Sequence, residues 1–111
     1  MKLESRFCIT NNGERIFGKG PCLLLEAIGR LGSLKKAANE LNMSYSKAWI
    51  IINKAEQVLG YSLLQTHIGG LDGGGSYLTP EANTLIKAYN AFNREAKDSA
   101  EELYRKYLSG I

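Results

Sequence analysis

The sequence predicts a mainly α-helical domain with two small β hairpins and a long helix at its C-terminal end. Three observations predict this fold class. Apolar residues recur at helical spacing in four segments, two turn signals are each flanked by short β-prone runs, and the last helical pattern continues from Pro80 to Leu108. A chain of 111 residues suits one domain around a single core, and 44% hydrophobic with 23% charged residues is a globular composition.

The first expected element is a β hairpin within residues 3–17. Arg6–Thr10 and Arg15–Phe17 are rich in β-prone residues, and the Asn11-Asn12-Gly13 sequence between them is a tight-turn signal. Pro21 then suits the start of a first helix, which we expect from about Cys22 to Leu31, with Leu24, Leu25 and Ile28 on its inner face.

Two further helices follow in quick succession. Ser33 is a good N-cap for a helix over Leu34–Leu41, and Ser44 is a good N-cap for a helix over Tyr45–Leu59. Two helices joined by so short a turn form a helix-turn-helix motif, which we place at residues 34–59.

A glycine-rich hairpin is expected next. Strands at Ser62–Thr66 and Ser76–Thr79 flank a loop with five glycines among residues 69–75, which cannot pack a core. Such a hairpin, here residues 62–79, is a wing. Residues 1–80 are therefore predicted to form a winged helix-turn-helix domain.

The last helix is expected to begin after Thr79 and to make up a separate unit, residues 81–111. At about 1.5 Å per residue it would be on the order of 40 Å long, which is more than a domain of this size can cover. We expect its apolar stripe to meet the same stripe of a second copy, the alternative being a helix folded back on its own domain. The dimerisation stripe comprises Leu85, Tyr89, Phe92, Ala96, Ala100, Leu103 and Tyr107.

The charge distribution points to a polyanionic partner. Residues 1–60 carry nine Lys/Arg and five Asp/Glu, a net charge of +4, whereas residues 80–111 carry five of each.

No apolar run is long enough to cross a membrane, and the first residues lack the apolar stretch of a secretory signal, so we expect a cytoplasmic protein without a membrane partner. Cys8 and Cys22 are expected to be reduced thiols, and no cofactor or metal site is indicated.

The helix-turn-helix and wing residues resemble a known family, the N-terminal DNA-binding domain of ModE, the molybdate-responsive regulator, and more loosely LysR-type regulators. The residues that carry the resemblance are Gly32-Ser33-Leu34-Lys35-Lys36-Ala37-Ala38, Met43-Ser44-Tyr45-Ser46-Lys47-Ala48-Trp49, Gly69-Gly70, Gly73-Gly74-Gly75 and Leu78-Thr79. The resemblance implies a sequence-specific regulator that binds double-stranded DNA as a homodimer on a pseudo-palindromic operator. The sequence departs from the family pattern in two ways: it reaches only Ile111, so we do not expect a molybdate-binding domain in this chain, and its wing lacks the basic residues common in the family.

Residues expected to contact DNA lie mainly on the second helix of the motif. Ala48, Ile51, Ile52, Ala55 and Leu59 form its inner face, and its N-terminal part would enter the major groove. The start of the helix before it would meet phosphates, with the wing glycines offering backbone N–H groups and Lys19 as an extra contact. The full set is Ser33, Lys35, Lys36, Ser44, Tyr45, Ser46, Lys47, Trp49, Ile50, Asn53, Lys54, Gly73, Gly74 and Gly75.

Other functions are also open at this point. A protein-interaction module would explain apolar Trp49 and Ile50 near the outer face of the helix, although Trp49 and Tyr45 could equally be packing residues. Oxyanion sensing at the glycine loop would use backbone N–H groups. An enzyme is not expected, because the only histidine, His67, stands alone and neither nucleotide-binding glycine motif is present.

Overall fold

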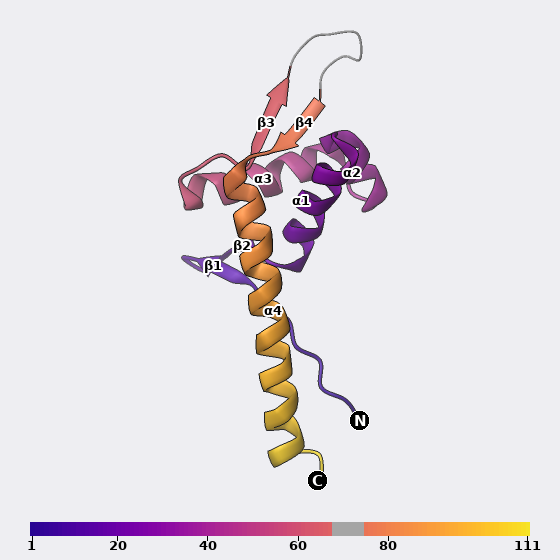
Figure 1. The fold of residues 1–111 in the computed structure, drawn as a ribbon, viewed down its shortest axis with the longest axis vertical. Coiled ribbons are helices and arrows are strands. Elements are labelled where there is room, and N and C mark those ends of the chain that lie inside the picture. The colour runs from indigo at the N-terminus through magenta and orange to yellow at the C-terminus, as the bar shows by residue number, and fades with distance from the viewer. Residues whose placement is uncertain (68–74) are drawn as a thin grey trace.

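The computed structural model describes residues 1–67 and 75–111 and confirms the predicted fold class. A winged helix-turn-helix head stands on a long C-terminal helix, and the longest dimension of the molecule is 61 Å (Figure 1). The elements in chain order are β1 (Ile9–Asn11), β2 (Glu14–Phe17), α1 (Lys19–Leu31), α2 (Leu34–Glu40), α3 (Tyr45–Leu59), β3 (Leu64–His67), β4 (Gly75–Leu78) and α4 (Pro80–Tyr107). Among the described residues, no helix is both long enough and apolar enough to span a membrane.

Helix α1 is the centre of the core. Leu24, Leu25 and Ile28 are completely buried, and α1 contacts α2, α3, α4 and β4. It begins at Lys19 rather than at Cys22, because Gly18 occupies the N-cap position. Pro21 is tolerated inside the first turn, because the N–H groups of a first turn have no partner within the helix and the N–H that proline lacks is therefore not missed. A strand of the wing approaches it closely, since a Cβ on Gly29 would lie 2.8 Å from the Leu78 side chain.

Local hydrogen bonds define the helix-turn-helix. As predicted, the hydroxyls of Ser33 and Ser44 accept hydrogen bonds from the N–H groups of Lys36 (3.1 Å) and Lys47 (3.0 Å). Asn42 adopts a left-handed conformation (φ 57°) at the end of α2, and the Met43 N–H returns to the Ala38 carbonyl at 3.0 Å. This Schellman turn sets the direction in which α3 leaves α2.

The N-terminal hairpin has the predicted turn but a shorter first strand than expected. Asn12 and Gly13 both have positive φ (51° and 80°), as a type I′ turn requires. The register shifts between Ile9 and Thr10, and residues 6–8 are not in a strand. The physical reason is that the Phe7 carbonyl accepts a hydrogen bond from the Tyr89 hydroxyl of α4 at 2.8 Å instead of pairing with β2.

The wing strands are shifted relative to their predicted positions. β3 begins at Leu64 rather than Ser62, because the Leu63 N–H donates to Glu56 of α3 (2.7 Å) and the Ser62 carbonyl accepts from the Thr79 hydroxyl (2.8 Å). Thr79 is likewise not part of β4. Its side chain caps α4 by accepting from the Ala82 N–H at 3.1 Å.

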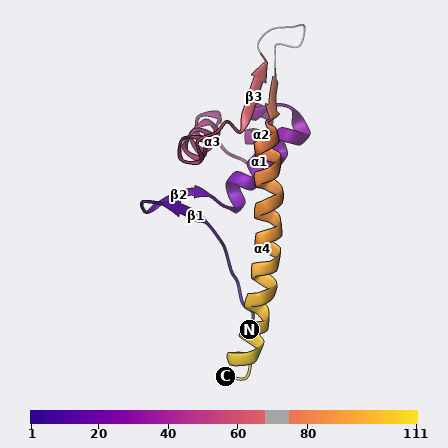
Figure 2. The same cartoon turned by 60° about the vertical axis from the view of Figure 1, so that its left-hand side comes forward.

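The core continues past residue 80 into the first turns of α4. Ala82 and Tyr89 are buried, and Leu85 packs against the same cluster. Beyond these turns α4 leaves the head, and the N-terminal segment lies beside it (Figures 1 and 2). The Phe7 ring meets Phe92 edge-on at 5.6 Å, which fastens this segment to α4.

Candidate nucleic-acid interface

Helix α3 has one buried and one exposed face. Ala48, Ile52 and Ala55 are buried against the head. On the opposite side lie Ser46, Lys47, Ile50, Asn53 and Gln57, all exposed. Ile50 is 62% exposed, whereas Ile52 two residues later is 1% exposed. The helix is therefore anchored on one side and presents a mixed polar and apolar surface on the other.

Two aromatic residues border this exposed face. Tyr45 is 49% exposed, and its ring meets Trp49 edge-on with centroids 6.2 Å apart. Trp49 is half-buried and packs against the core cluster. Trp49 is thus a packing residue of the head that keeps one edge at the surface, beside the first turn of α3.

The start of α2 presents two lysines to solvent. Lys35 and Lys36 are exposed, and Ser33 before them is half-buried with its hydroxyl used in the helix cap. At the other end of α2 the Glu40 carboxylate receives two hydrogen bonds from Arg30 of α1, one of 3.0 Å. Hydrogen bonding and charge from Arg30 lower the pKa of Glu40, and this exposed ion pair links the ends of α1 and α2.

The wing glycines fall into two groups. Gly73 and Gly74 lie outside the described residues, so their expected contact with phosphate remains a prediction. Gly75 is half-buried, and a Cβ there would approach the Gly32 carbonyl to 2.9 Å. The next residue, Ser76, donates its N–H to that same carbonyl at 3.1 Å. Gly75 therefore has a structural role that the sequence did not reveal, which is to let β4 dock on the α1–α2 turn.

Lys54 is not a free cation. Its Nζ lies 3.1 Å from Glu14 Oε1 on the N-terminal hairpin. Sequence reasoning missed this partner, because forty residues separate the two positions and no local pattern links them. The ion pair joins the hairpin to α3, which is also in contact with β2.

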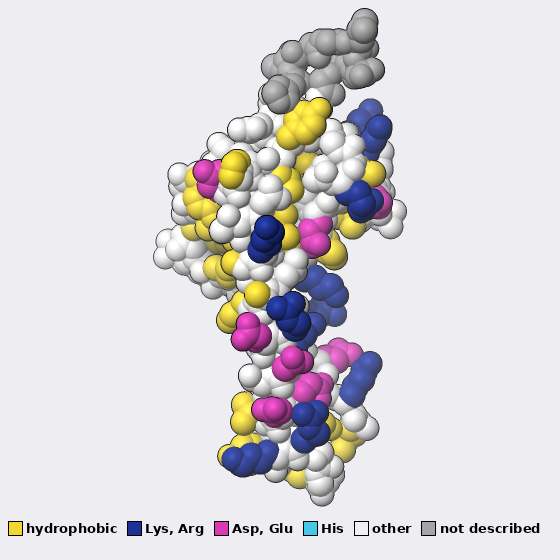
Figure 3. All heavy atoms as spheres, viewed as in Figure 1, with side chains coloured by type: hydrophobic (Ala, Val, Ile, Leu, Met, Phe, Trp, Pro, Cys, Tyr) yellow, Lys and Arg dark blue, Asp and Glu magenta, His cyan; other side chains and the backbone are white. Residues whose placement is uncertain are grey.

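The predicted dimerisation stripe is divided in two by the structure. Leu85 and Tyr89 belong to the core of their own chain, so they are not available to a partner. Ala96 and Ala100 are half-buried. The exposed members are Phe92 (57%), Leu103 (55%) and Tyr107 (63%). Charged residues of both signs cover the face of α4 shown in Figure 3.

The two cysteines occupy different environments and do not form a disulfide. Cys8 is exposed, whereas Cys22 is buried with its Sγ 3.5 Å from Glu26 and 3.7 Å from Asn90. Burial, with the nearby Glu26 carboxylate, raises the pKa of Cys22 to about 12, so this thiol is protonated and unreactive. Residues 1–67 and 75–111 contain no group of three or more His, Cys, Asp or Glu side chains that could hold a metal ion.

Comparison with known proteins bears on the same region. Residues 23–83 match the family of bacterial regulatory helix-turn-helix proteins, lysR family. The chain is 43% identical over 68 residues to the molybdenum-pterin-binding protein MopB of Rhodobacter capsulatus, covering 61% of this chain and 25% of that protein. It is 36% identical over 67 residues to the DNA-binding transcriptional dual regulator ModE of Escherichia coli K12, covering 60% of this chain and 26% of that protein. This likeness confirms the resemblance to ModE.

A solved structure shows the same fold. The crystal structure of ArgP from Mycobacterium tuberculosis superposes with a TM-score of 0.52 at 23% identity, covering 77% of this chain and 30% of that one. The match to the curated relatives covers about a quarter of their length, 25% of MopB and 26% of ModE. The matched residues contain α2, α3 and the wing, and the chain belongs to the bacterial regulatory helix-turn-helix proteins of the lysR family.

Proposed function

We propose that this chain binds specific DNA sequences as a transcriptional regulator, with α3 as the recognition helix. The observation that carries the proposal is the contrast between the two faces of α3. Ile52 anchors the helix at 1% exposure, while Ser46, Lys47 and Ile50 stand out from the head. In helix-turn-helix proteins the N-terminal part of such a helix enters the major groove.

The exposed side chains match the chemistry of base edges. Lys47 can donate to O6 and N7 of guanine, Ser46 can bond to several base edges, and Ile50 can contact a thymine methyl group. Lys35 and Lys36 at the start of α2 lie where the first helix of the motif crosses the phosphate backbone. Asn53 is farther along α3 and is assigned to phosphate.

The regulator acts as a homodimer in this proposal. Phe92, Leu103 and Tyr107 form an exposed apolar stripe on α4 that a second copy would cover. Two-fold symmetry then places equivalent α3 helices on half-sites about 10 bp apart or a multiple of that spacing. As a DNA-binding regulator, it would act in the bacterial cytoplasm.

A second candidate function rests on the same exposed face. Ile50 at 62% and Tyr45 at 49% exposure would also suit a protein partner. The two functions differ in their dependence on salt, because DNA binding releases counterions and weakens steeply as salt is added. Docking through apolar residues would depend little on salt.

The deciding experiment selects bound sequences from a random duplex pool and then measures affinity by fluorescence anisotropy across a salt series. A palindromic consensus with a steep salt slope is expected. Lys47→Ala should weaken binding by roughly 5- to 100-fold, and Ser46→Ala should relax selectivity at one base position. Lys87→Ala, at an exposed lysine of α4, is the matched control and should bind like the parent. Normal binding by both α3 variants would exclude α3 as the recognition helix.

A further inference from the structure

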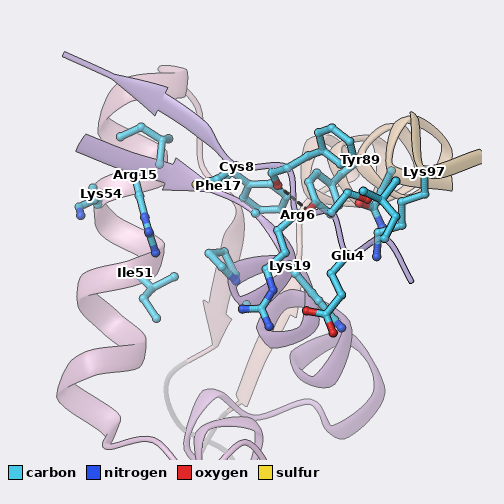
Figure 4. Close-up of a pocket in the computed structure, with 18 of the residues that line it drawn as sticks. Glu4, Arg6, Cys8, Arg15, Phe17, Lys19, Ile51, Lys54, Tyr89 and Lys97 are labelled. Atoms are coloured by element: carbon cyan, nitrogen blue, oxygen red, sulfur yellow. Dashed lines mark hydrogen bonds between the residues drawn. The ribbon is translucent and has the colours of Figure 1, made fainter. Parts of the chain in front are cut away.

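An open groove runs between α3 and the N-terminal part of the chain. It has a volume of about 840 Å³, and its walls come from the N-terminal segment, β2, the start of α1, α3 and α4 (Figure 4). We call it the hairpin groove. Four of its lining residues, Lys47, Ile50, Ile51 and Lys54, belong to α3, so the groove adjoins the proposed recognition surface.

The hairpin groove is strongly cationic. Seven of its lining residues are Lys or Arg, and two are Glu. Among the described residues, Lys54 is the only one of the seven that forms an ion pair within 4 Å, its partner being Glu14. Gathering unneutralised cations in one groove raises their electrostatic free energy, and a polyanion would lower it.

Three cations outside α3 face this space. Figure 4 shows Arg6 and Lys19 in the middle of the groove, from the N-terminal segment and the first residue of α1, and Arg15 of β2 alongside α3. All three are exposed. The acidic members, Glu4 and Glu101, come from the N-terminal segment and the C-terminal half of α4.

The hairpin and α3 project from the molecule on the same side. Figure 2 shows both standing away from α4, with β1–β2 next to α3. A duplex that receives α3 in its major groove has a sugar-phosphate strand on each side of that helix. The strand on the hairpin side would pass Arg15 and the mouth of the groove.

We propose that the β1–β2 hairpin and the residues that flank it form a second DNA-contacting wing, in which Arg15 of β2, Arg6 before the hairpin and Lys19 after it bind the phosphate backbone flanking the major groove that α3 occupies. This inference rests on the proposed function. It assigns to the hairpin and its flanking residues the electrostatic role that the β3–β4 wing cannot fill with side chains of its own, because residues 62–79 contain no Lys or Arg. Phosphate contacts of this kind add affinity without reading sequence.

The test measures the salt dependence of binding for variants of the full chain. Each phosphate contact contributes about −0.9 to the slope of log affinity against log salt. A substitution is present in both copies of the proposed homodimer, so R15Q and K19Q should each flatten the slope by about 1.8 and R6Q/R15Q/K19Q by about 5. The loss should be equal on the selected operator and on random duplex. R94Q, at an exposed arginine of α4 outside the groove, is the matched control, and R15K should keep the parental slope.

A variant of opposite sign sharpens the test. E14Q removes the partner of Lys54 in both copies of the proposed homodimer, so it should strengthen DNA binding and steepen the slope by about 1.8. Thermal unfolding of each variant verifies that it folds. Groove variants that bind with parental affinity and slope, while Lys47→Ala weakens binding, would overturn this inference and leave the proposed function intact. Loss restricted to the selected operator would also overturn it, and a parent chain that binds no DNA would end both proposals.

Discussion

The two halves of α4 carry one continuous amphipathic pattern but have different surroundings. In the first turns the stripe is buried within the chain itself, with Tyr89 at 6% exposure. One turn later Phe92 is 57% exposed although its ring contacts Phe7, and Leu103 and Tyr107 are exposed too, while Ala96 and Ala100 between them are half-buried. The same periodicity therefore places residues in the core of the head in the first half of α4 and on the surface in the second half. Periodicity identifies a helix face that needs covering but not what covers it.

The covered half is fixed by contacts with residues distant in sequence. The Tyr89 ring meets Phe17 edge-on at 5.5 Å, and its hydroxyl donates to the Phe7 carbonyl at 2.8 Å. Desolvation raises the pKa of Tyr89, so the hydroxyl stays a proton donor. The Cys22 thiol donates a hydrogen bond to Asn90 Oδ1 at 3.7 Å. Beside the open half lies the N-terminal segment (Figures 1 and 2), and Phe92, Leu103 and Tyr107 are exposed despite it.

The largest effect is expected for the alkylation rate of Cys22, whose side chain contacts the covered half of α4 at Asn90. The pKa of Cys22 is raised to about 12 from an ordinary value of 9.0, so at pH 8 the native thiolate fraction is roughly a thousandfold below that of the unfolded chain. Alkylation of Cys22 in a Cys8→Ser background, followed by mass spectrometry, should be slower in the native state by at least this factor. It should speed up about tenfold per pH unit as pH rises toward the pKa. Rapid labelling at pH 8 without urea would show that the covered half opens readily.

The next largest effect is expected for the free energy of unfolding when one stripe residue in each half of α4 is replaced by alanine. Tyr89→Ala leaves a cavity between α4 and β2, so it should lower the free energy of unfolding by about 3–5 kcal/mol. Leu103→Ala should change it by less than about 0.5 kcal/mol under conditions where the chain is monomeric. Urea unfolding followed by circular dichroism measures both. Equal effects at the two positions would contradict the division of α4 described above.

Negative charge introduced on the exposed stripe of α4 should weaken the proposed homodimer. Phe92→Glu with Leu103→Glu puts like charges into the proposed dimer seam, so the dissociation constant of the homodimer should rise by roughly 10- to 100-fold, which corresponds to about 1.4–3 kcal/mol. Sedimentation velocity over a concentration series detects the change. Lys87→Glu, at an exposed lysine on the side of α4 opposite the stripe, serves as a control for added negative charge. A parent chain that stays monomeric at high concentration would count against the dimer.

The smallest effect is expected from removing a single hydroxyl. Tyr89→Phe keeps the ring against Phe17 but loses the hydrogen bond to Phe7, which should cost about 1 kcal/mol in unfolding. Faster amide exchange or proteolysis of residues 1–8 should accompany it, because this bond fastens the segment. Unchanged protection of the segment would show that the Phe7–Phe92 ring contact holds it alone.

Much of the fold followed from short-range patterns. Ser33 and Ser44 were predicted as caps and bond to N–H groups three residues away, and Asn12-Gly13 forms the expected turn. Elements were misplaced where a distant residue takes a backbone group. The first strand lost residues 6–8 to contacts with α4, and β3 starts late because Glu56 and Thr79 bind the residues before it.

The candidate site divides in the same way. The exposure of Ser46, Lys47 and Ile50 follows from the position of each residue on a helix whose opposite face is apolar. The pairing of Lys54 with Glu14 and the cationic groove beside it could not be predicted, because they depend on where the N-terminal hairpin docks. Gly75 looked like part of a loose loop, yet its lack of a side chain lets β4 approach Gly32.

The sequence by itself determined the helices, their caps, the turn between α2 and α3 and the outward face of α3, because each depends on residues within about one or two helical turns. Only the tertiary structure decided that Tyr89 belongs to the head while Phe92 does not, and that the N-terminal hairpin lies against α3. These outcomes depend on contacts such as Tyr89 with Phe7, which are 82 residues apart. Hydrogen bonds between neighbours are encoded locally, whereas burial is settled by whichever distant surface packs against a residue.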